Sequence, residues 1–565
     1  MIPKDCRRLA EVDFPIAVVS RHAAREKSIR HGHPATLHLW WARRPLASCR
    51  AMLLALLLPD PCDPHCPLDF KTKARGLLPR LRGEIGPKDE DLRREILGFI
   101  ADFSNWDNSS ESTFLEVGRG LVKAAYPEEP PLVVDPFAGG GSIPLEALRL
   151  GCETFASDLN PVACLILKVM LEDIPRHGSA LAEELRRVGK EIKKSAEREL
   201  AEFYPPDPDG ARPIAYLWAR TVRCETPGCG AEIPLARSFW LSKKANRRRA
   251  LRYRVVRPEG GPPRVEFEIF EPKNDREVPS GTVSRAKATC PACRIPLGPD
   301  RVRAQLQEQR GGADVVFDDR GRRVGGARLL AVVTLQPGEQ GRHYRLPAGR
   351  DYEAVWKAMK RLERIAVKAL PGDLSPVPNE PLPPIGTLGF RVQRYGMLQW
   401  GDLYAARQKI ALILLASQLR AKADELAQGL RHLVALALGK TADLSNSGAP
   451  WKPGAECPVH MFSSQKIPPF WDWAEAVVTV DSSGSFASAY ERSATALEAA
   501  FNYPYQPGAS EIADVAKSGA LPDASAHVWF TDPPYYNAIP YADLSDFFFT
   551  WLKRALPGSP LLRDP

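Results

Sequence analysis

The sequence lacks any apolar run long enough to cross a membrane, and its first residues do not have the pattern of a secretory signal peptide. The longest apolar run, Ala51 to Leu58, is far shorter than the ~20 residues that a membrane-spanning helix needs. Cysteine is too sparse for a disulfide framework, because 11 cysteines in 565 residues favour free thiols or metal ligands. We therefore expect a cytoplasmic protein with no membrane partner.

The chain also lacks an extreme charge and an internal repeat. Its net charge of +9 permits a polyanionic partner without demanding one. A charged content of 26% and a hydrophobic content of 44% are typical of a globular protein. The length predicts roughly three or four folded units.

The most informative stretch that is present is Asp532-Pro533-Pro534-Tyr535, which follows an apolar run at 527–531 that predicts a buried strand. Proline fixes φ and carries no N–H, so the turn is stiff and its carbonyls remain available. The Asp532 carboxylate and the Pro533 carbonyl can each accept one N–H of a planar exocyclic amine, and Tyr535 offers a face on which an extruded base can stack. Taken alone, the tetrapeptide fits an ordinary proline-rich turn equally well.

A second motif lies at the end of another predicted strand. Leu132 to Val134 run into Asp135-Pro136-Phe137-Ala138-Gly139-Gly140-Gly141-Ser142, and residues 143–150 have helical spacing. Strand, glycine turn and helix form a nucleotide-type pocket, because glycines let the backbone approach a ligand closely. The next predicted strand, 154–157, ends in Asp158-Leu159-Asn160, where an acidic side chain can hold ribose hydroxyls. No Gly-Lys-Ser/Thr follows the turn, which argues against a triphosphate-binding loop, and Asp135-Pro-Phe is not a nicotinamide fingerprint.

Together these motifs resemble those of the amino-methyltransferases that use S-adenosylmethionine. The first motif of those enzymes, Asp-x-Phe-x-Gly-x-Gly, is matched at Asp135, Phe137, Gly139 and Gly141. Their catalytic motif is matched at 532–535. The N-terminal run from Phe14 to Trp40-Trp41-Ala42-Arg43-Arg44-Pro45, together with residues 536–544, is similar to a prokaryotic family of adenine-specific DNA methylases that carry an internal zinc ribbon and an N-terminal domain of unknown function.

This resemblance implies an α/β fold: a Rossmann-like S-adenosylmethionine-dependent methyltransferase core, interrupted by a long insertion that contains a zinc ribbon and a helical region. It implies methyl transfer to N6 of adenine in DNA, within a restriction–modification or phage-defence system and with helicase or ATPase partners. The cofactor is then expected over the 135–141 turn, on Asp158, and near Asn160, Asp514 and Trp41. The alternatives that remain open are methylation of RNA or of cytosine N4, and a non-catalytic DNA-binding subunit of a defence complex.

The motifs divide the chain into five segments. An N-terminal segment, 1–60, is expected to pack on the cofactor pocket. The others are the first part of the core at 115–202, the zinc-ribbon insertion at 205–370, the helical insertion at 387–505 and the second part of the core at 506–565. Only about one helix, Leu544 to Leu556, fits after the catalytic motif, so we expect a truncated core with little turnover.

Four cysteines in the first insertion form two knuckles with the spacing of a metal site, Cys224 with Cys229 and Cys290 with Cys293. Four thiolates suit a tetrahedral structural zinc ion and leave no open position for catalysis. Between the knuckles lies a basic cluster made of Lys243, Lys244, Arg247, Arg248 and Arg249. An ordinary solvated loop has the same composition, but the place of this cluster within a DNA enzyme favours contact with the phosphate backbone.

Overall fold

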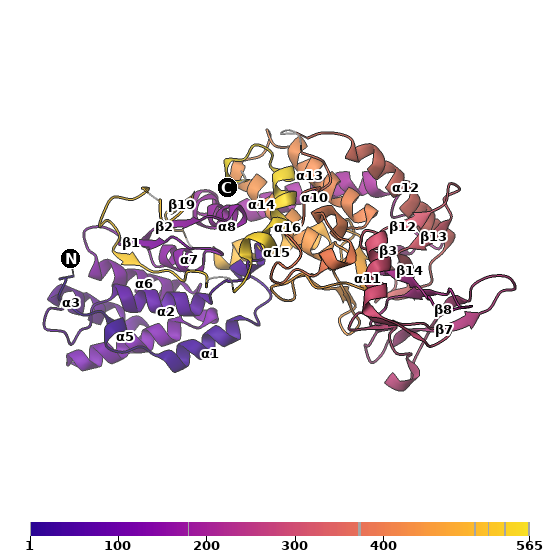
Figure 1. Ribbon diagram of the computed structural model, residues 1–565. Helices are drawn as coiled ribbons and strands as arrows, with labels where there is room; N and C mark the ends of the chain where they lie inside the picture. The colour runs from indigo at the N-terminus through magenta and orange to yellow at the C-terminus, as the bar shows by residue number, and fades with distance from the viewer. Residues whose placement is uncertain are drawn as a thin grey trace.

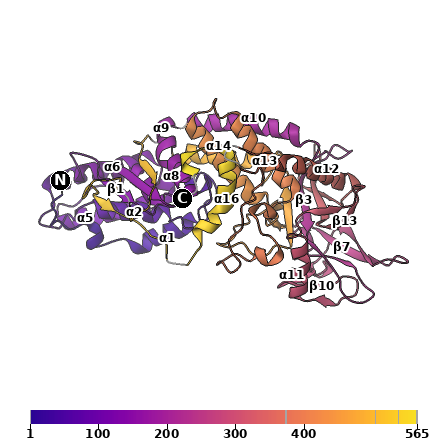
Figure 2. The same cartoon turned by 45° about the horizontal axis from the view of Figure 1, so that its top comes forward.

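The protein is a mixed α/β structure in which one parallel sheet and several smaller antiparallel sheets are joined by helices (Figure 1). The computed structural model describes residues 2–178, 180–370, 374–501, 504–517, 519–535 and 538–562. The parallel sheet and the N-terminal helices lie at one end of an elongated molecule, the antiparallel strands lie at the other, and a layer of helices lies between them (Figure 2).

The parallel sheet has the strand order β19-β2-β1-β20. Its strands are β1 (Leu132–Asp135), β2 (Glu153–Asp158), β19 (Ala509–Ile512) and β20 (Val528–Trp529). In the register, Val134 lies opposite Phe155 on one side and Trp529 on the other. All neighbouring pairs are parallel, so the carboxyl ends of the four strands meet at one edge. Strands far apart in the sequence therefore form one sheet.

Helices pack against the strands of this sheet. α7 (Ser142–Arg149) packs against β1 and β2, and α8 (Pro161–Leu167) packs against β2 and β19. A π-helical turn at Lys168–Asp173 continues α8 into α9 (Ile174–His177). On the other side of α7 lies α2 (Leu46–Leu57), which belongs to the N-terminal helices.

The N-terminal helical layer continues beyond residue 60, through a region (61–114) to which the sequence analysis assigned no segment. Its other helices are α1 (Ile16–Glu26), α3 (Leu68–Leu77), α4 (Pro79–Arg82), α5 (Asp89–Phe103) and α6 (Ser112–Ala125). In α5, three acidic residues occupy the first turn, where they interact favourably with the helix dipole. Its buried Leu92, Ile96 and Phe99 recur at helical spacing and face α2.

The central layer consists of helices from both predicted core parts and from the helical insertion. It contains α10 (Ala180–Leu200), α13 (Ala406–Ala421), α14 (Gln428–Leu444), α15 (Phe486–Ala500) and α16 (Tyr541–Ala555). α13 and α14 both pack against α16, which follows the Asp532 motif.

The largest antiparallel sheet joins the two predicted insertions. Its order is β15-β14-β3-β18, with β3 (Arg212–Ala219), β14 (Arg328–Leu335), β15 (His343–Arg345) and β18 (Asp472–Ala476). The other elements of this end are β4 (Thr221–Arg223), β5 (Glu232–Pro234), β6 (Trp240–Ser242), β7 (Arg249–Val256), β8 (Arg264–Phe270), β9 (Val283–Ser284), β10 (Lys287–Thr289), β11 (Pro296–Leu297), α11 (Pro299–Glu308), β12 (Val315–Phe317), β13 (Arg323–Gly326), α12 (Gly349–Ala366), β16 (Trp451–Lys452) and β17 (Cys457–Pro458). The zinc-ribbon and helical segments therefore share a sheet, because β18 lies in the second and pairs with β3 of the first.

A buried ion pair fastens the central helices to this shared sheet. Arg407 of α13 lies 2.7 Å from Glu475 of β18, and both side chains are about 1% exposed. Glu475 also accepts hydrogen bonds from Trp218 Nε1 and from the Tyr204 hydroxyl. Because a buried charge is tolerated only with such partners, this network ties α13, β3 and β18 into one arrangement. Within the described ranges, no helix is both long enough and apolar enough to cross a membrane.

Candidate functional site

A cavity of about 790 Å³ lies at the carboxyl edge of the parallel sheet. This edge is where open α/β sheets bind ligands, and the volume is in the range of ligand pockets. Many residues singled out from the sequence line it: Trp41, Asp135, Phe137, Gly139, Asp158, Asn160, Asp514, Asp532, Pro533, Pro534 and Tyr535. The structure thus brings both motifs to one cavity. Gly141, by contrast, is not part of the lining.

The glycine turn needs glycine at two positions for different reasons. Gly139 and Gly141 have φ values of +48° and +73°, in the left-handed region that side chains rarely adopt. A Cβ at Gly139 would lie 2.4 Å from Nε1 of Trp40, in the wall of the cavity. A Cβ at Gly141 would lie 2.5 Å from the Met170 methyl group, in the packed interior. Gly139 therefore shapes the cavity, and Gly141 allows α7 to pack.

Asp158 links the end of β2 to this turn. Its two carboxylate oxygens accept hydrogen bonds from the backbone N–H of Gly139 and of Asn160, each at 2.9 Å. Burial raises the pKa of Asp158 above its usual range. Each oxygen keeps a second lone pair that a ligand hydroxyl can use. Asn160 caps α8 through the Val162 N–H and donates to Ser545, so part of its role is structural.

Asp135 is buried at the end of β1 and connects the two motifs. It accepts hydrogen bonds from the Phe137 N–H at 3.2 Å and from the Thr531 hydroxyl at 2.7 Å, and Thr531 directly precedes Asp532. Burial raises the pKa of Asp135 to about 7, and the nearby charges of Asp158 and Asp532 act in the same direction. Among the described residues of the lining, five carry carboxyl groups and two, Arg43 and Arg44, carry guanidinium groups, and Asp532 already pairs with Arg44. The remaining carboxyl groups favour a ligand that carries positive charge.

The Asp532-Pro533-Pro534-Tyr535 turn follows β20 and reaches solvent. The Tyr535 side chain is 78% exposed, so no protein group covers its ring faces fully. Asp532 forms an ion pair with Arg44, whose guanidinium Nε donates to the carboxylate. The Arg44 carbonyl accepts from the Ser142 hydroxyl at 2.8 Å, which holds this N-terminal segment against α7. Any amine that binds Asp532 must therefore displace or share the Arg44 contact.

An aromatic wall closes the cavity opposite the sheet. Trp40 stacks on Tyr541 with ring centroids 6.2 Å apart and an interplanar angle of 16°. Trp41 packs edge-on against Phe462 at 5.1 Å. Sequence reasoning assigned no site role to Trp40, Arg44 or the α16 residues Tyr541, Ser545, Asp546 and Phe549, all of which line the cavity. Two stretches of the sequence, residues 40–45 and the residues after Tyr535, stand out in the family resemblance and contain these side chains. Neither stretch predicts which other residues the side chains contact.

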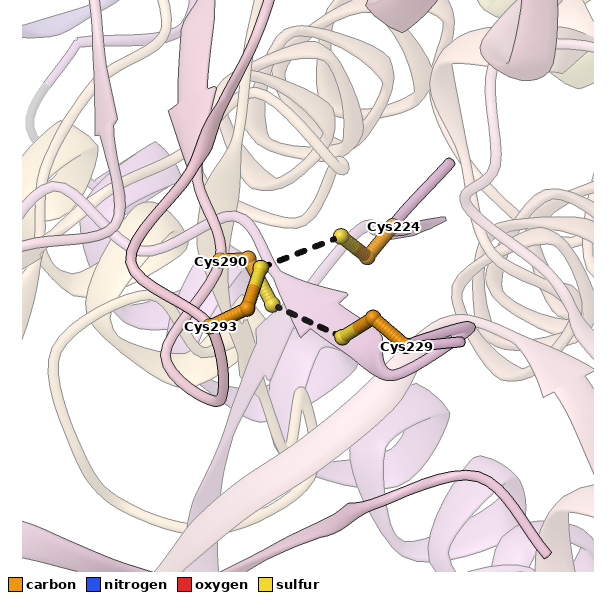
Figure 3. A group of neighbouring side chains, drawn as sticks. All are labelled: Cys224, Cys229, Cys290 and Cys293. Atoms are coloured by element: carbon orange, nitrogen blue, oxygen red, sulfur yellow. Dashed lines mark hydrogen bonds between the residues drawn. The ribbon is translucent and has the colours of Figure 1, made fainter. Parts of the chain in front are cut away.

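The four predicted metal ligands converge between β4, β5 and β10 (Figure 3). The Sγ atoms of Cys224 and Cys293 are 3.6 Å apart, those of Cys229 and Cys290 are 3.7 Å apart, and all four lie within 4.8 Å of one another. Ligands at about 2.3 Å in a tetrahedron would be about 3.8 Å apart, so the cluster is a candidate metal site compatible with structural zinc. Burial raises the pKa of Cys290 to about 12 and that of Cys229 above its usual range, whereas hydrogen bonds from the Ile295 backbone and neighbouring groups lower the pKa of Cys293 to about 7 despite its burial. Binding of a metal ion would therefore have to release protons from the buried thiols.

The predicted DNA-binding cluster is partly neutralised by acidic residues of the protein itself. Lys243 and Arg248 pair with Asp275 at 3.6 and 2.6 Å, and Lys244 and Arg247 pair with Glu456 at 3.0 and 3.4 Å. Arg249 pairs with Glu271 at 2.8 Å. Every member of the cluster thus has an acidic partner, but Asp275 and Glu456 each serve two cations, so three carboxylates offset only part of the charge of the five basic residues.

The fold and the cavity together define a mixed α/β protein with a cavity at the carboxyl edge of a parallel sheet. The family model described as "Protein of unknown function (DUF1156)" matches residues 13–76. This region includes α1 and α2, and it contributes Trp40, Trp41 and Arg44 to the cavity. No curated protein and no solved structure matches the chain.

Proposed function

We propose that this protein is a DNA methyltransferase that transfers a methyl group from S-adenosylmethionine to N6 of adenine. The observation that supports the proposal is the shared cavity: the glycine turn at 135–141, Asp158 and the Asp532–Tyr535 turn all line it, although they lie far apart in the sequence. The strand order and the crevice at the carboxyl edge suit a Rossmann-like methyltransferase core. A role in restriction–modification or phage defence, with helicase or ATPase partners, rests on the sequence resemblance alone.

The cofactor half of the site is proposed at β1, β2 and β19. When bound, S-adenosylmethionine supplies an electrophilic methyl group on a positively charged sulfur. The carboxyl groups of Asp135 and Asp158 suit this charge, and Asp158 also offers acceptors for ribose hydroxyls. Gly139 leaves room for Trp40 in the wall of the cavity, and Asp514, just after β19 in the lining, is the proposed contact of the adenine ring.

The target half is proposed at the Asp532-Pro533-Pro534-Tyr535 turn. An adenine extruded from the duplex would donate its two amine N–H groups to the Asp532 carboxylate and the Pro533 carbonyl. These bonds draw the nitrogen lone pair out of conjugation and aim it at the methyl donor. Tyr535 is exposed and can stack on the ring. Catalysis then consists of alignment and electrostatics without a covalent intermediate.

The test is incubation of the full-length protein with labelled S-adenosylmethionine and separate DNA and RNA pools, followed by mass spectrometry of the digested nucleosides. We expect N6-methyladenine in DNA. If methyl groups are found only in RNA, or only on cytosine N4, then that nucleotide is the substrate and the proposed assignment to adenine in DNA is wrong. DNA binding with no transfer to any pool would instead favour a non-catalytic subunit.

Replacing Asp158 by alanine is expected to weaken S-adenosylmethionine binding by roughly 1–3 kcal/mol, the scale of a lost charge-assisted hydrogen bond. The variant removes both the proposed ribose acceptor and the bond that holds the Gly139 N–H. Isothermal titration calorimetry would measure the change. Asp158→Asn is the matched control, because it keeps one acceptor oxygen and should lose less. Equal affinities for all three proteins would contradict the assigned contact.

Cofactor affinity is also expected to depend on pH through Asp135, whose pKa burial raises to about 7. A cationic ligand favours the ionised carboxylate, so affinity should rise as pH increases through 7, by about 10-fold between roughly pH 6 and 8. Calorimetry over this range tests the sign. Asp135→Asn keeps an acceptor for Phe137 and Thr531 but cannot ionise, so it should show only the titration of the ligand itself. The same pH profile in both proteins would refute the assignment.

A further inference from the structure

A second cavity, of about 610 Å³, is lined by four arginines from three separate parts of the chain. Arg285 lies in the turn between β9 and β10, and Arg303 lies in α11. Arg391 and Arg394 lie at a 3₁₀ turn, Val392–Tyr395. Among the described residues that line this cavity there is no aspartate or glutamate.

Three of these four arginines differ from the 243–249 cluster in lacking an acidic partner within the described residues. Arg285, Arg391 and Arg394 are exposed, and no ion pair joins any of them to another residue within the described ranges. Arg303 pairs with Asp300 at 2.5 Å, yet its buried Nε atom has no hydrogen-bond partner. Cations that converge without counter-charge repel one another, so an external anion would stabilise this arrangement.

The turn that carries Arg285 adds a second observation. Arg285 and Ala286 have φ values of 47° and 66°, and they connect two antiparallel strands. A two-residue hairpin turn of this kind favours asparagine and glycine, which adopt positive φ at little cost. An arginine and an alanine stand there instead, so the turn presents a cation at the cavity in a strained conformation.

The chemistry of the cavity suits a phosphate group rather than a base. Arginine presents a planar fork of donors that matches phosphate oxygens in two-point contacts. The aromatic residues of the lining, Phe390, Tyr395 and Trp471, are 4–8% exposed, and Tyr395 packs edge-on against Trp471 at 5.4 Å. Their faces are therefore unavailable for stacking on a nucleobase.

One short segment connects this cavity to the first. Gln465 lines the first cavity and its side chain donates to the Trp41 carbonyl. Two residues later, the Ile467 carbonyl accepts from the Arg391 N–H at 3.2 Å, and Pro469 lines the second cavity. From 465 to 469 an extended chain spans at most about 14 Å. At a rise of 3.4 Å per nucleotide along one strand, these two lining residues are therefore no farther apart than about four nucleotides of duplex DNA.

We propose that the arginine-lined cavity binds the phosphodiester backbone of the substrate nucleic acid, a few nucleotides from the base that enters the first cavity. This inference rests on the proposed function, because it takes the substrate to be a nucleic acid strand. It moves the main backbone contact from the partly neutralised 243–249 cluster to Arg285, Arg303, Arg391 and Arg394. The contact is independent of sequence, since phosphates carry no base information.

The experiment is a fluorescence anisotropy titration of the full chain with a labelled DNA duplex, and separately with an RNA of the same sequence, at several salt concentrations. Replacing Arg391 and Arg394 together by alanine should weaken binding by about 10-fold and reduce the slope of log affinity against log salt by about 1.8, for two lost phosphate contacts. The matched control is Arg249→Ala with Arg252→Ala, which should stay within about 2-fold because each residue already pairs with a carboxylate of its own, Glu271 and Glu268. Lysine at 391 and 394 should restore most of the affinity.

The readout does not depend on methyl transfer, so the two proposals fail separately. Unchanged affinity and salt slope in the Arg391→Ala, Arg394→Ala variant would overturn the inference, as would a wild-type chain that binds neither DNA nor RNA. Binding that depends on these arginines in a protein without turnover would support the inference and overturn only the proposed activity. The arginine side chains are exposed, so equal thermal unfolding of the variants would show that the fold is intact.

Discussion

Asp532→Ala in the full-length protein is expected to lose methyl transfer to DNA by about 1,000-fold while it keeps nearly the same affinity for S-adenosylmethionine. The carboxylate is assigned to the target amine, where it aligns the nitrogen and stabilises the charge that develops on it. The residues proposed for the cofactor lie on β1, β2 and β19, whereas Asp532 follows β20. Loss of turnover with retained cofactor binding is therefore the specific signature of this role.

Mass spectrometry of digested DNA measures the turnover, and calorimetry measures cofactor affinity. Tyr535→Phe is the matched control within the same turn, because it keeps the aromatic face and should retain most activity. Asp532→Ala also leaves Arg44 without its ion-pair partner. If Asp532→Ala forms N6-methyladenine at the normal rate, the proposed mechanism is wrong.

Loss of a cysteine ligand is the other change with a large expected effect. The wild-type protein should contain about one zinc ion per chain, and Cys290→Ala should contain none. Binding of structural zinc releases about 10–16 kcal/mol in small zinc-finger peptides, so much of the local folding energy depends on it. The apolar cluster around the cysteines, which includes Val222, Ile233 and Leu306, is separate from the clusters around the first cavity. We therefore expect local unfolding between β4 and α11 with cofactor affinity preserved.

Elemental analysis and limited proteolysis would measure these two effects. Cys62→Ala, at a partly buried cysteine outside the cluster, is the control and should retain the metal and its protease resistance. Treatment with a chelator should reproduce the behaviour of Cys290→Ala in the wild-type chain. A wild-type protein that contains no metal when purified without chelators would rule out the zinc assignment.

Much of the parallel sheet could be predicted because its signals are local. Leu132 to Val134 form an apolar run before a glycine turn, and residues 527–531 form one before a proline turn, so the position of each strand is visible in its own few residues. The prediction of a buried strand at 527–531 was wrong in extent and burial, because β20 spans only Val528–Trp529 at the edge of the sheet and Trp529 is 59% exposed. The shared antiparallel sheet could not be predicted. β18 and β3 are separated by some 250 residues, and the sequence Asp472–Ala476 carries no signal that names its partner.

The residues of the candidate site also fall into two groups: those with a local signal in the sequence, and those whose role depends on a distant partner. Asp135, Asp158 and Asp532 were found because each follows a recognisable strand, whereas Arg44 became relevant only through its contact with Asp532. The basic cluster at 243–249 illustrates the opposite error. Its charge density is obvious in the sequence, but its partners Asp275, Glu271 and Glu456 lie elsewhere in the chain. The arginines of the second cavity are single residues in three distant segments, so only the fold brings them together.

The strand order of the parallel sheet also determines how long its central strands lack their neighbours during synthesis of the chain. β1 and β2 emerge from the ribosome early, but the strands that flank them, β19 and β20, begin only at Ala509 and Val528. At about 5–20 residues per second, the interval between Asp158 and Ala509 lasts roughly 20 to 70 seconds. Throughout that time both edges of the β1–β2 pair lack their strand partners, a state that invites association with other chains. The intervening segments have apolar cores of their own and can fold before β19 and β20 are synthesised. The first cavity, which needs the residues after these two strands, is therefore completed last.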